Sequence, residues 1–127
     1  MYSDSKKTEL MIKILMVFLG GGIGSVLRYL ISIGVVRYSA LDFPLGTFMA
    51  NFLSCLLMVL FVRSDKFIEP DDPLRLLLMV GVLGGFSTFS TFSYETSALI
   101  KEGHHMMALG NVGLSVSVCV YCLFKLT

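Results

Sequence analysis

The sequence is poor in charged residues and has no tryptophan. Asp, Glu, Lys and Arg make up 15% of its 127 residues, against about a quarter in an ordinary soluble domain. The formal net charge is only +1, and there is no long run of one sign of charge of the kind found in nucleic-acid-binding surfaces or solvating tails. A soluble globular domain and a polyanion-binding protein are therefore both disfavoured.

The N-terminal segment lacks the small-x-small cleavage site of a secretory signal peptide, although Lys6, Lys7 and Lys13 precede an apolar run. We therefore predict a retained first helix. Cysteine is scarce as well: Cys55, Cys119 and Cys122 all fall within apolar runs, and buried free thiols are their simplest interpretation.

What the chain does have is apolar sequence, with hydrophobic residues at 55%. A bilayer core about 30 Å thick needs about 20 mostly apolar helical residues. Four stretches meet that requirement, over residues 11–36, 44–62, 74–100 and 106–124. We therefore expect an all-α membrane protein whose residues 1–127 form one transmembrane domain, with an aqueous loop over residues 63–75 and a polar turn over residues 101–105.

The distribution of Lys and Arg favours cytoplasmic termini under the positive-inside rule. Seven cations fall on the side shared by the termini and the central loop, and two fall on the other side. The first group is Lys6, Lys7, Lys13, Arg63, Lys66, Arg75 and Lys125, and the second is Arg37 and Lys101.

The third span combines glycines, hydroxyls and phenyl rings over residues 81–95. Paired glycines followed by Ser and Thr weaken a helix, so we expect a break near residues 84–88. Backbone that unwinds at membrane depth persists only where protein or an ion satisfies its carbonyls. This segment therefore predicts a cation held by backbone oxygens.

Downstream of the expected break, Thr88, Thr91 and Glu95 recur at helical spacing, and Phe89 and Phe92 occupy the adjoining face. Phenyl rings have positive edges, so two rings can help hydroxyl donors to coordinate a small anion. Plain packing is the alternative for the rings. For Glu95, a functional carboxylate, an ion pair with Arg28 and a structural hydrogen bond all remain open.

Other polar residues also lie within the apolar spans. Asn51 is either an interhelical hydrogen-bonding residue or an amide that offers N–H groups to an ion. In the fourth span Asn111, Ser115 and Cys119 are spaced four apart, which predicts one polar stripe that either bonds within the bundle or lines a pore. Arg28 follows a glycine-rich segment and could attract anions at a pore mouth.

Three segments together resemble the fluoride ion channel family called Fluc or CrcB. They are Gly-Gly-Gly-x-Gly-Ser-x-x-Arg-Tyr at residues 20–29, Pro-Leu-Gly-Thr-x-x-x-Asn at residues 44–51, and Gly-Gly-Phe-Ser-Thr-Phe-Ser-Thr-Phe-Ser-x-Glu at residues 84–95. The order and spacing of the three segments make the resemblance specific.

The resemblance implies a passive fluoride channel in a bacterial inner membrane that exports fluoride from the cytoplasm. It also implies an antiparallel, dual-topology dimer, with a structural sodium ion at its centre held by the carbonyls of Gly84 and Ser87. The family's pore-lining positions correspond here to Asn51, Phe89, Phe92, Asn111 and Ser115, and its basic and acidic positions correspond to Arg28 and Glu95. The hydroxyls of Thr88 and Thr91, which the spacing places beside the rings, complete the predicted pore lining.

Departures from the family pattern are Ser87 in place of the more usual Thr, Ser54 in place of Gly, and Cys119 where a hydroxyl would continue the polar stripe. The unequal cation count leaves open a homodimer or a pair with an oppositely inserted homologue. A small multidrug exporter and a non-conducting scaffold subunit are the competing functions. Because no nucleophile, base and orienting group converge in the sequence, we do not expect an enzyme.

Overall fold

The protein is all-helical in the residues that its computed structural model describes, which are 2–38, 43–64 and 69–126. Four helical spans within those residues are long and apolar enough to cross a membrane. The first is α1 (Tyr2–Tyr38), the second α2 (Leu45–Val62) and the fourth α6 (His105–Leu126). The third span is composite and consists of α3 (Pro73–Arg75), η2 (Leu76–Val82), α4 (Leu83–Phe86) and α5 (Phe89–Lys101).

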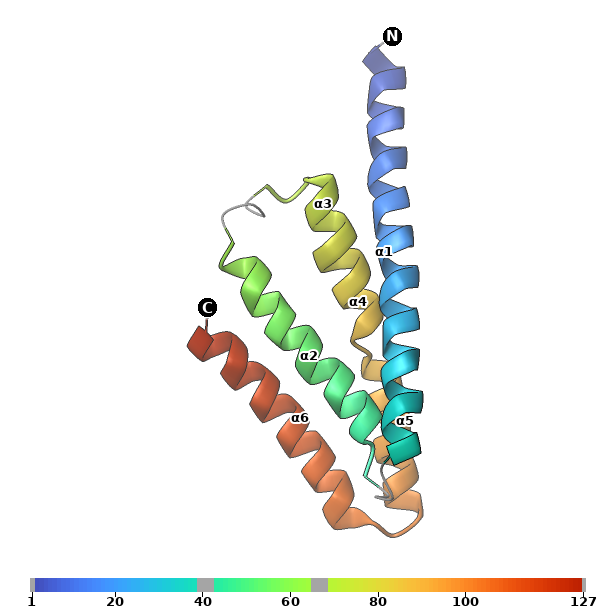
Figure 1. Ribbon diagram of the computed structural model, residues 1–127, viewed down its shortest axis with the longest axis vertical. Helices are drawn as coiled ribbons and strands as arrows, with labels where there is room; N and C mark the ends of the chain where they lie inside the picture. Colours follow the sequence, from blue (N-terminus) through green and yellow to red (C-terminus); the bar gives the residue numbers. More distant parts are fainter. Residues whose placement is uncertain (1, 39–42, 65–68, 127) are drawn as a thin grey trace.

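The spans run in alternating directions (Figure 1). The start of α1, the end of α2 and the start of α3 lie toward one end of the molecule, and the α5–α6 turn lies at the other. Lys66, one of the cations used for the orientation, lies outside the described residues. At the first end, Lys13 on α1 forms ion pairs with Glu9, at 2.7 Å, and with Asp71, at 3.2 Å.

Short-range signals explain where the helices begin and end. Pro73 occupies the first turn of α3, and the Asp72 side chain caps it by accepting from the Leu74 N–H at 3.0 Å. At the end of α5, Gly103 has a φ of +85°, and His104 N–H donates back to the Leu99 carbonyl at 2.8 Å. This is a Schellman C-terminus, in which glycine accommodates the left-handed backbone.

Glycines let α1 and the third span pack backbone to backbone. A Cβ on Gly81 would lie 2.8 Å from Gly20 Cα, and one on Gly85 would lie 3.0 Å from Gly21 Cα. One on Gly24 would meet the Phe86 nitrogen at 2.7 Å. Small residues of this kind are what closely packed membrane helices require, so the glycine-rich segment of α1 fixes the position of the third span.

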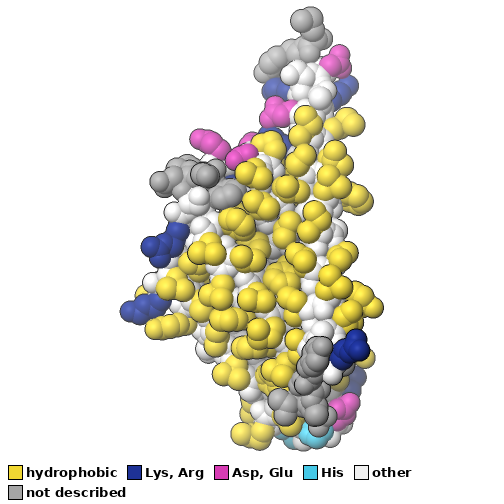
Figure 2. All heavy atoms as spheres, viewed as in Figure 1, with side chains coloured by type: hydrophobic (Ala, Val, Ile, Leu, Met, Phe, Trp, Pro, Cys, Tyr) yellow, Lys and Arg dark blue, Asp and Glu magenta, His cyan; other side chains and the backbone are white. Residues whose placement is uncertain are grey.

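Polar side chains share the interior with apolar ones, and many large apolar side chains are exposed. Buried positions include Thr47, Ser54, Thr88, Asn111 and Ser115, whereas large apolar residues such as Phe18, 74% exposed, face outward. Figure 2 shows apolar side chains covering the middle of one face, with charged side chains toward its ends and along one edge. Such a surface suits lipid, and the buried polar side chains can hydrogen-bond between spans.

Candidate functional site

Two residues with extended backbone separate α4 from α5. Ser87 has φ −76° and ψ 154°, and Thr88 has φ −152° and ψ 120°. The Leu83 carbonyl terminates α4 by accepting from Ser87 N–H at 3.0 Å, from Ser87 Oγ at 3.0 Å and from Ser54 Oγ at 3.2 Å. Ser54, the residue that departs from the family's Gly, therefore joins α2 to the first residue of α4.

The amide of Asn51 bonds to the backbone of Thr88 on both sides. Thr88 N–H donates to Asn51 Oδ1 at 2.8 Å, and Asn51 Nδ2 donates to the Thr88 carbonyl at 3.3 Å. In an uninterrupted α-helix the Thr88 N–H would bond the Gly84 carbonyl. Asn51 thus replaces a helical hydrogen bond, which confirms an interhelical role for it and places its amide at the junction of α4 and α5.

Thr88 also caps α5. Its hydroxyl accepts from Thr91 N–H at 3.3 Å and donates to Thr91 Oγ1 at 3.1 Å, and it lies 3.2 Å from Ser90 Oγ. A Thr at this position satisfies backbone donors that the first turn of a helix leaves unpaired. The predicted Thr88 and Thr91 hydroxyls are therefore brought together, and they bond mainly to each other and to the cap.

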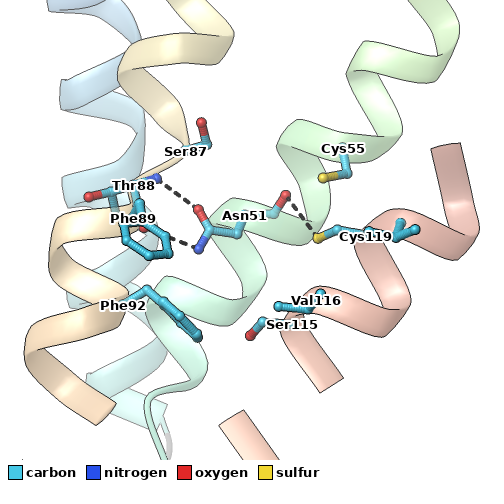
Figure 3. A pocket seen from close by; sticks show the side chains of 10 residues that line it. Asn51, Cys55, Ser87, Thr88, Phe89, Phe92, Ser115, Val116 and Cys119 are labelled. Atoms are coloured by element: carbon cyan, nitrogen blue, oxygen red, sulfur yellow. Dashed lines mark hydrogen bonds between the residues drawn. The ribbon is translucent and has the colours of Figure 1, made fainter. Parts of the chain in front are cut away.

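A groove of about 330 Å³ opens beside this junction. We call it the Asn51 groove; α2, the Ser87–Thr88 junction, α5 and α6 all contribute to its walls (Figure 3). It is lined by Asn51, Cys55, Ser87, Thr88, Phe89, Phe92, Ser115, Val116, Cys119 and Val120. Most of its wall is apolar, and the polar atoms of Asn51, Thr88 and Ser115 interrupt it.

Phe89 and Phe92 both line the groove but differ in exposure. Phe89 is 80% exposed and Phe92 only 9%, and their ring centroids are 5.8 Å apart with a 38° angle between the planes. Phe92 is thus fixed by its surroundings. Phe89 stands on the open side, where an additional molecule could pack against it.

The polar stripe of α6 is divided between the groove and the protein interior. Asn111, 1% exposed, donates from Nδ2 to Thr96 Oγ1 at 2.9 Å and accepts from Ser115 Oγ at 3.4 Å. Thr96 Oγ1 in turn donates to the Phe92 carbonyl at 2.8 Å. Ser115 lines the groove and Asn111 does not. Thr96, one helical turn beyond Phe92, was not among the residues predicted from the sequence.

Glu95 lies away from the Asn51 groove, in a separate cavity of about 250 Å³ that Pro44, Tyr94 and Glu102 also line. Its Oε1 accepts from Thr47 Oγ1 at 2.8 Å, while Oε2 is buried and has no hydrogen-bond partner among the described residues. The structural hydrogen bond is therefore present. Within the described part of the chain Arg28 is partly buried and forms no ion pair with Glu95.

The residues expected to hold a cation, Gly84 and Ser87, lie at the end of α4. A Cβ on Gly84 would meet no atom within 4 Å, so its backbone faces open space, and the Thr88 N–H that would otherwise bond its carbonyl is taken by Asn51. Across the described residues no three His, Cys, Asp or Glu side chains gather as a metal site.

Comparison with known proteins gives a consistent result. Residues 15–125 match the family described as CrcB-like protein, Camphor Resistance (CrcB). The chain is 48% identical over 90 residues to a protein of Phocaeicola vulgatus named fluoride-specific ion channel FluC, with 71% of this chain and 74% of that protein covered. It is 40% identical over 111 residues to one of the same name from Shewanella piezotolerans, with 87% and 90% covered.

Proposed function

The chain belongs to the CrcB-like family, and on that basis we propose that it is a passive, fluoride-selective ion channel. Relatives carrying that name cover most of the chain. Membership in the family makes the protein a transporter and not an enzyme. The structural observation that carries the proposal is the Asn51 groove, where an amide and two phenyl rings meet at a helix junction.

The groove supplies the kinds of group that replace water around a small anion. Asn51 Nδ2 carries two hydrogens, and its bond to Thr88 uses one, so the other is available to an ion. The edges of Phe89 and Phe92 offer positive potential without a formal charge. Ser115 contributes a hydroxyl from α6. Weak ligands of this type bind an ion without trapping it.

A structural sodium ion is part of the proposal. Gly84 and Ser87 would hold it through their carbonyl oxygens, and bound there it would neutralise the carbonyl dipoles at the end of α4. Support comes from the diverted Thr88 N–H and from the open space at Gly84. The interruption at Ser87 and Thr88 is, in this view, the functional break of the third span.

We propose that the working unit pairs two chains inserted in opposite directions in a bacterial inner membrane. Phe89 is exposed beside the groove, and a second bundle would enclose it. A second copy of this chain is the simplest partner, and an oppositely inserted homologue is the alternative suggested by the asymmetry of Lys and Arg. An inside-negative potential favours anion exit by about 2.3 kcal/mol per 100 mV, so passive flow suffices for export.

The test is fluoride efflux from liposomes that contain the purified chain alone. We expect rapid fluoride flux with chloride excluded. Phe89→Ile should reduce the flux about tenfold, since about 1.4 kcal/mol of lost ion stabilisation has that effect on a rate. Phe124→Ile is the matched control, because Phe124 is also 80% exposed and does not line the groove.

Three outcomes would contradict parts of the proposal. Absence of flux from monodisperse protein would favour a missing partner subunit or the scaffold alternative, in which Asn51 and Asn111 only join helices. Flux unaffected by Phe89→Ile would mean that the pore lies elsewhere. Flux driven by a proton gradient would favour the exporter alternative.

A further inference from the structure

Two thiols face the Asn51 groove from different helices. Cys55 lies one turn beyond Asn51 on α2, and Cys119 lies one turn beyond Ser115 on α6. Figure 3 shows both sulfurs between the two helices. The Cys119 Sγ donates to the backbone carbonyl of Asn51 at 3.9 Å, and Cys55 lines the same groove one turn further along α2.

We propose that Cys55 and Cys119 form a two-thiolate site for a soft metal cation, of the class of Cu⁺, Ag⁺ and Hg²⁺, and that occupancy of this site blocks the groove. Soft cations select thiolate sulfur over the oxygen and nitrogen ligands around it. On binding, each S–H bond breaks, a sulfur–metal bond forms, and two protons are released to water. No oxidant is needed, because neither sulfur nor metal changes oxidation state.

The position of the two sulfurs explains the expected block. Both line the cavity that Phe89 and Asn51 also line, and Cys119 bonds the same residue whose side chain holds the helix junction. A cation between the sulfurs would join α2 to α6 across the groove. The two thiolates bring two negative charges, so bound Cu⁺ or Ag⁺ leaves one net negative charge that would repel fluoride, whereas bound Hg²⁺ leaves a neutral group that would obstruct the groove. This consequence rests on the proposed channel function, whereas the binding itself does not.

Cys122 provides the internal control. It stands three residues after Cys119 on α6, so Cys119 and Cys122 form a Cys-x-x-Cys pair, and a helix places such residues on neighbouring turns. Cys122 does not line the groove. Three pairs of cysteines are possible, and removing each cysteine in turn separates them, because only the pair of Cys55 and Cys119 survives the loss of Cys122.

The experiment measures Hg²⁺ binding to the purified full-length chain in detergent, by metal stoichiometry and by the ultraviolet absorption of mercury–thiolate bonds. We expect one tightly bound Hg²⁺ per chain in the wild type and in Cys122→Ser. Cys55→Ser and Cys119→Ser should each lose about 100-fold in apparent affinity, because the second bond of a two-point attachment is intramolecular. Cys55→Ala and Cys119→Ala repeat the measurement if a serine variant is not monodisperse.

The second readout is fluoride flux in liposomes with and without Hg²⁺. Block should occur in the wild type and in Cys122→Ser, be reversed by dithiothreitol, and be absent in Cys55→Ser. Retention of tight binding in Cys55→Ser with loss in Cys122→Ser would overturn the inference in favour of the Cys-x-x-Cys pair. Binding without block would overturn the placement of the site in the ion route. A chain without any fluoride flux contradicts the proposed function and leaves the binding result intact.

Discussion

Thr47 and Glu95, which are 48 positions apart in the sequence, are joined by a hydrogen bond of 2.8 Å from Thr47 Oγ1 to Glu95 Oε1. Thr47 is only 4% exposed, and the bond links α2 to α5 away from the Asn51 groove. The second carboxylate oxygen is buried without a partner among the described residues. The Thr47 hydroxyl is therefore the contact that most directly fixes the Glu95 side chain.

Thr47→Val should destabilise the folded protein by about 1 kcal/mol, because it removes a hydrogen bond from a buried polar group in a membrane span. Thr47→Ser retains the hydroxyl and should stay close to the wild type. Unfolding in a denaturing detergent measures both. Equal stability of the two variants would show that this bond contributes little to the fold.

Gly24→Ala should weaken the packing of α1 against the third span, because its Cβ would meet the Phe86 nitrogen at 2.7 Å and the backbone of Val82. Backbone cannot move aside as a flexible side chain can, so we expect a loss of about 2 kcal/mol, within the usual range for overpacking. Thermal unfolding measures the effect.

Gly22→Ala is the matched control for Gly24→Ala, since a Cβ on Gly22 would meet nothing within 4 Å. The higher helix propensity of Ala should make this variant slightly more stable than the wild type. If Gly22→Ala loses as much stability as Gly24→Ala, the packing of α1 on the third span does not explain the losses. Contacts of α1 with another subunit would then explain the loss in both variants.

Thr96→Val should impair fluoride flux, although Thr96 does not line the Asn51 groove. Thr96 connects Asn111 to the Phe92 carbonyl, so Val leaves the nearly fully buried Asn111 amide without that acceptor and loosens α5 where it carries Phe92. We expect lower flux and about 1–3 kcal/mol lower stability. Thr96→Ser preserves both bonds, and an identical loss in this variant would count against the explanation.

Asn51→Asp separates the structural role of Asn51 from its role toward the ion. The carboxylate still accepts from Thr88 N–H, but it cannot donate an N–H to an anion and adds negative charge beside the groove. We expect a folded protein by size-exclusion chromatography with fluoride flux lost in the liposome assay. Flux near the wild-type level in Asn51→Asp would remove the amide from the ion route.

The apolar runs of the sequence predicted the four spans, because lipid imposes both length and hydropathy on a membrane helix. They did not predict that α1 would begin at Tyr2, ahead of the apolar run at residue 11. A helix that continues into water is no longer marked by hydropathy. Nor did they predict the π-helical segment η2, since the extra residue in each turn leaves no clear mark in composition.

The sequence identified which residues are candidates for the site, but it could not show which of them bond to one another. For Asn51 it left an interhelical bond and an ion ligand open, and in the folded chain the amide bonds to the backbone of Thr88. The partner of Glu95 was equally undetermined, because a bond between Thr47 and Glu95 depends on how α2 crosses α5. Thr96 was not predicted, because it is one of many hydroxyl residues in the same helix and its sequence position does not distinguish it from the others.

The length of α1 provides a way to measure in which direction the chain is inserted in the membrane. At about 1.5 Å per residue its 37 residues measure about 55 Å, which exceeds a hydrocarbon core of about 30 Å. The exposed, charged residues 4–10 therefore stand in water on one side only. A protease added outside sealed vesicles would trim the chains whose first helix points outward and spare the others, so the trimmed fraction directly counts the two orientations.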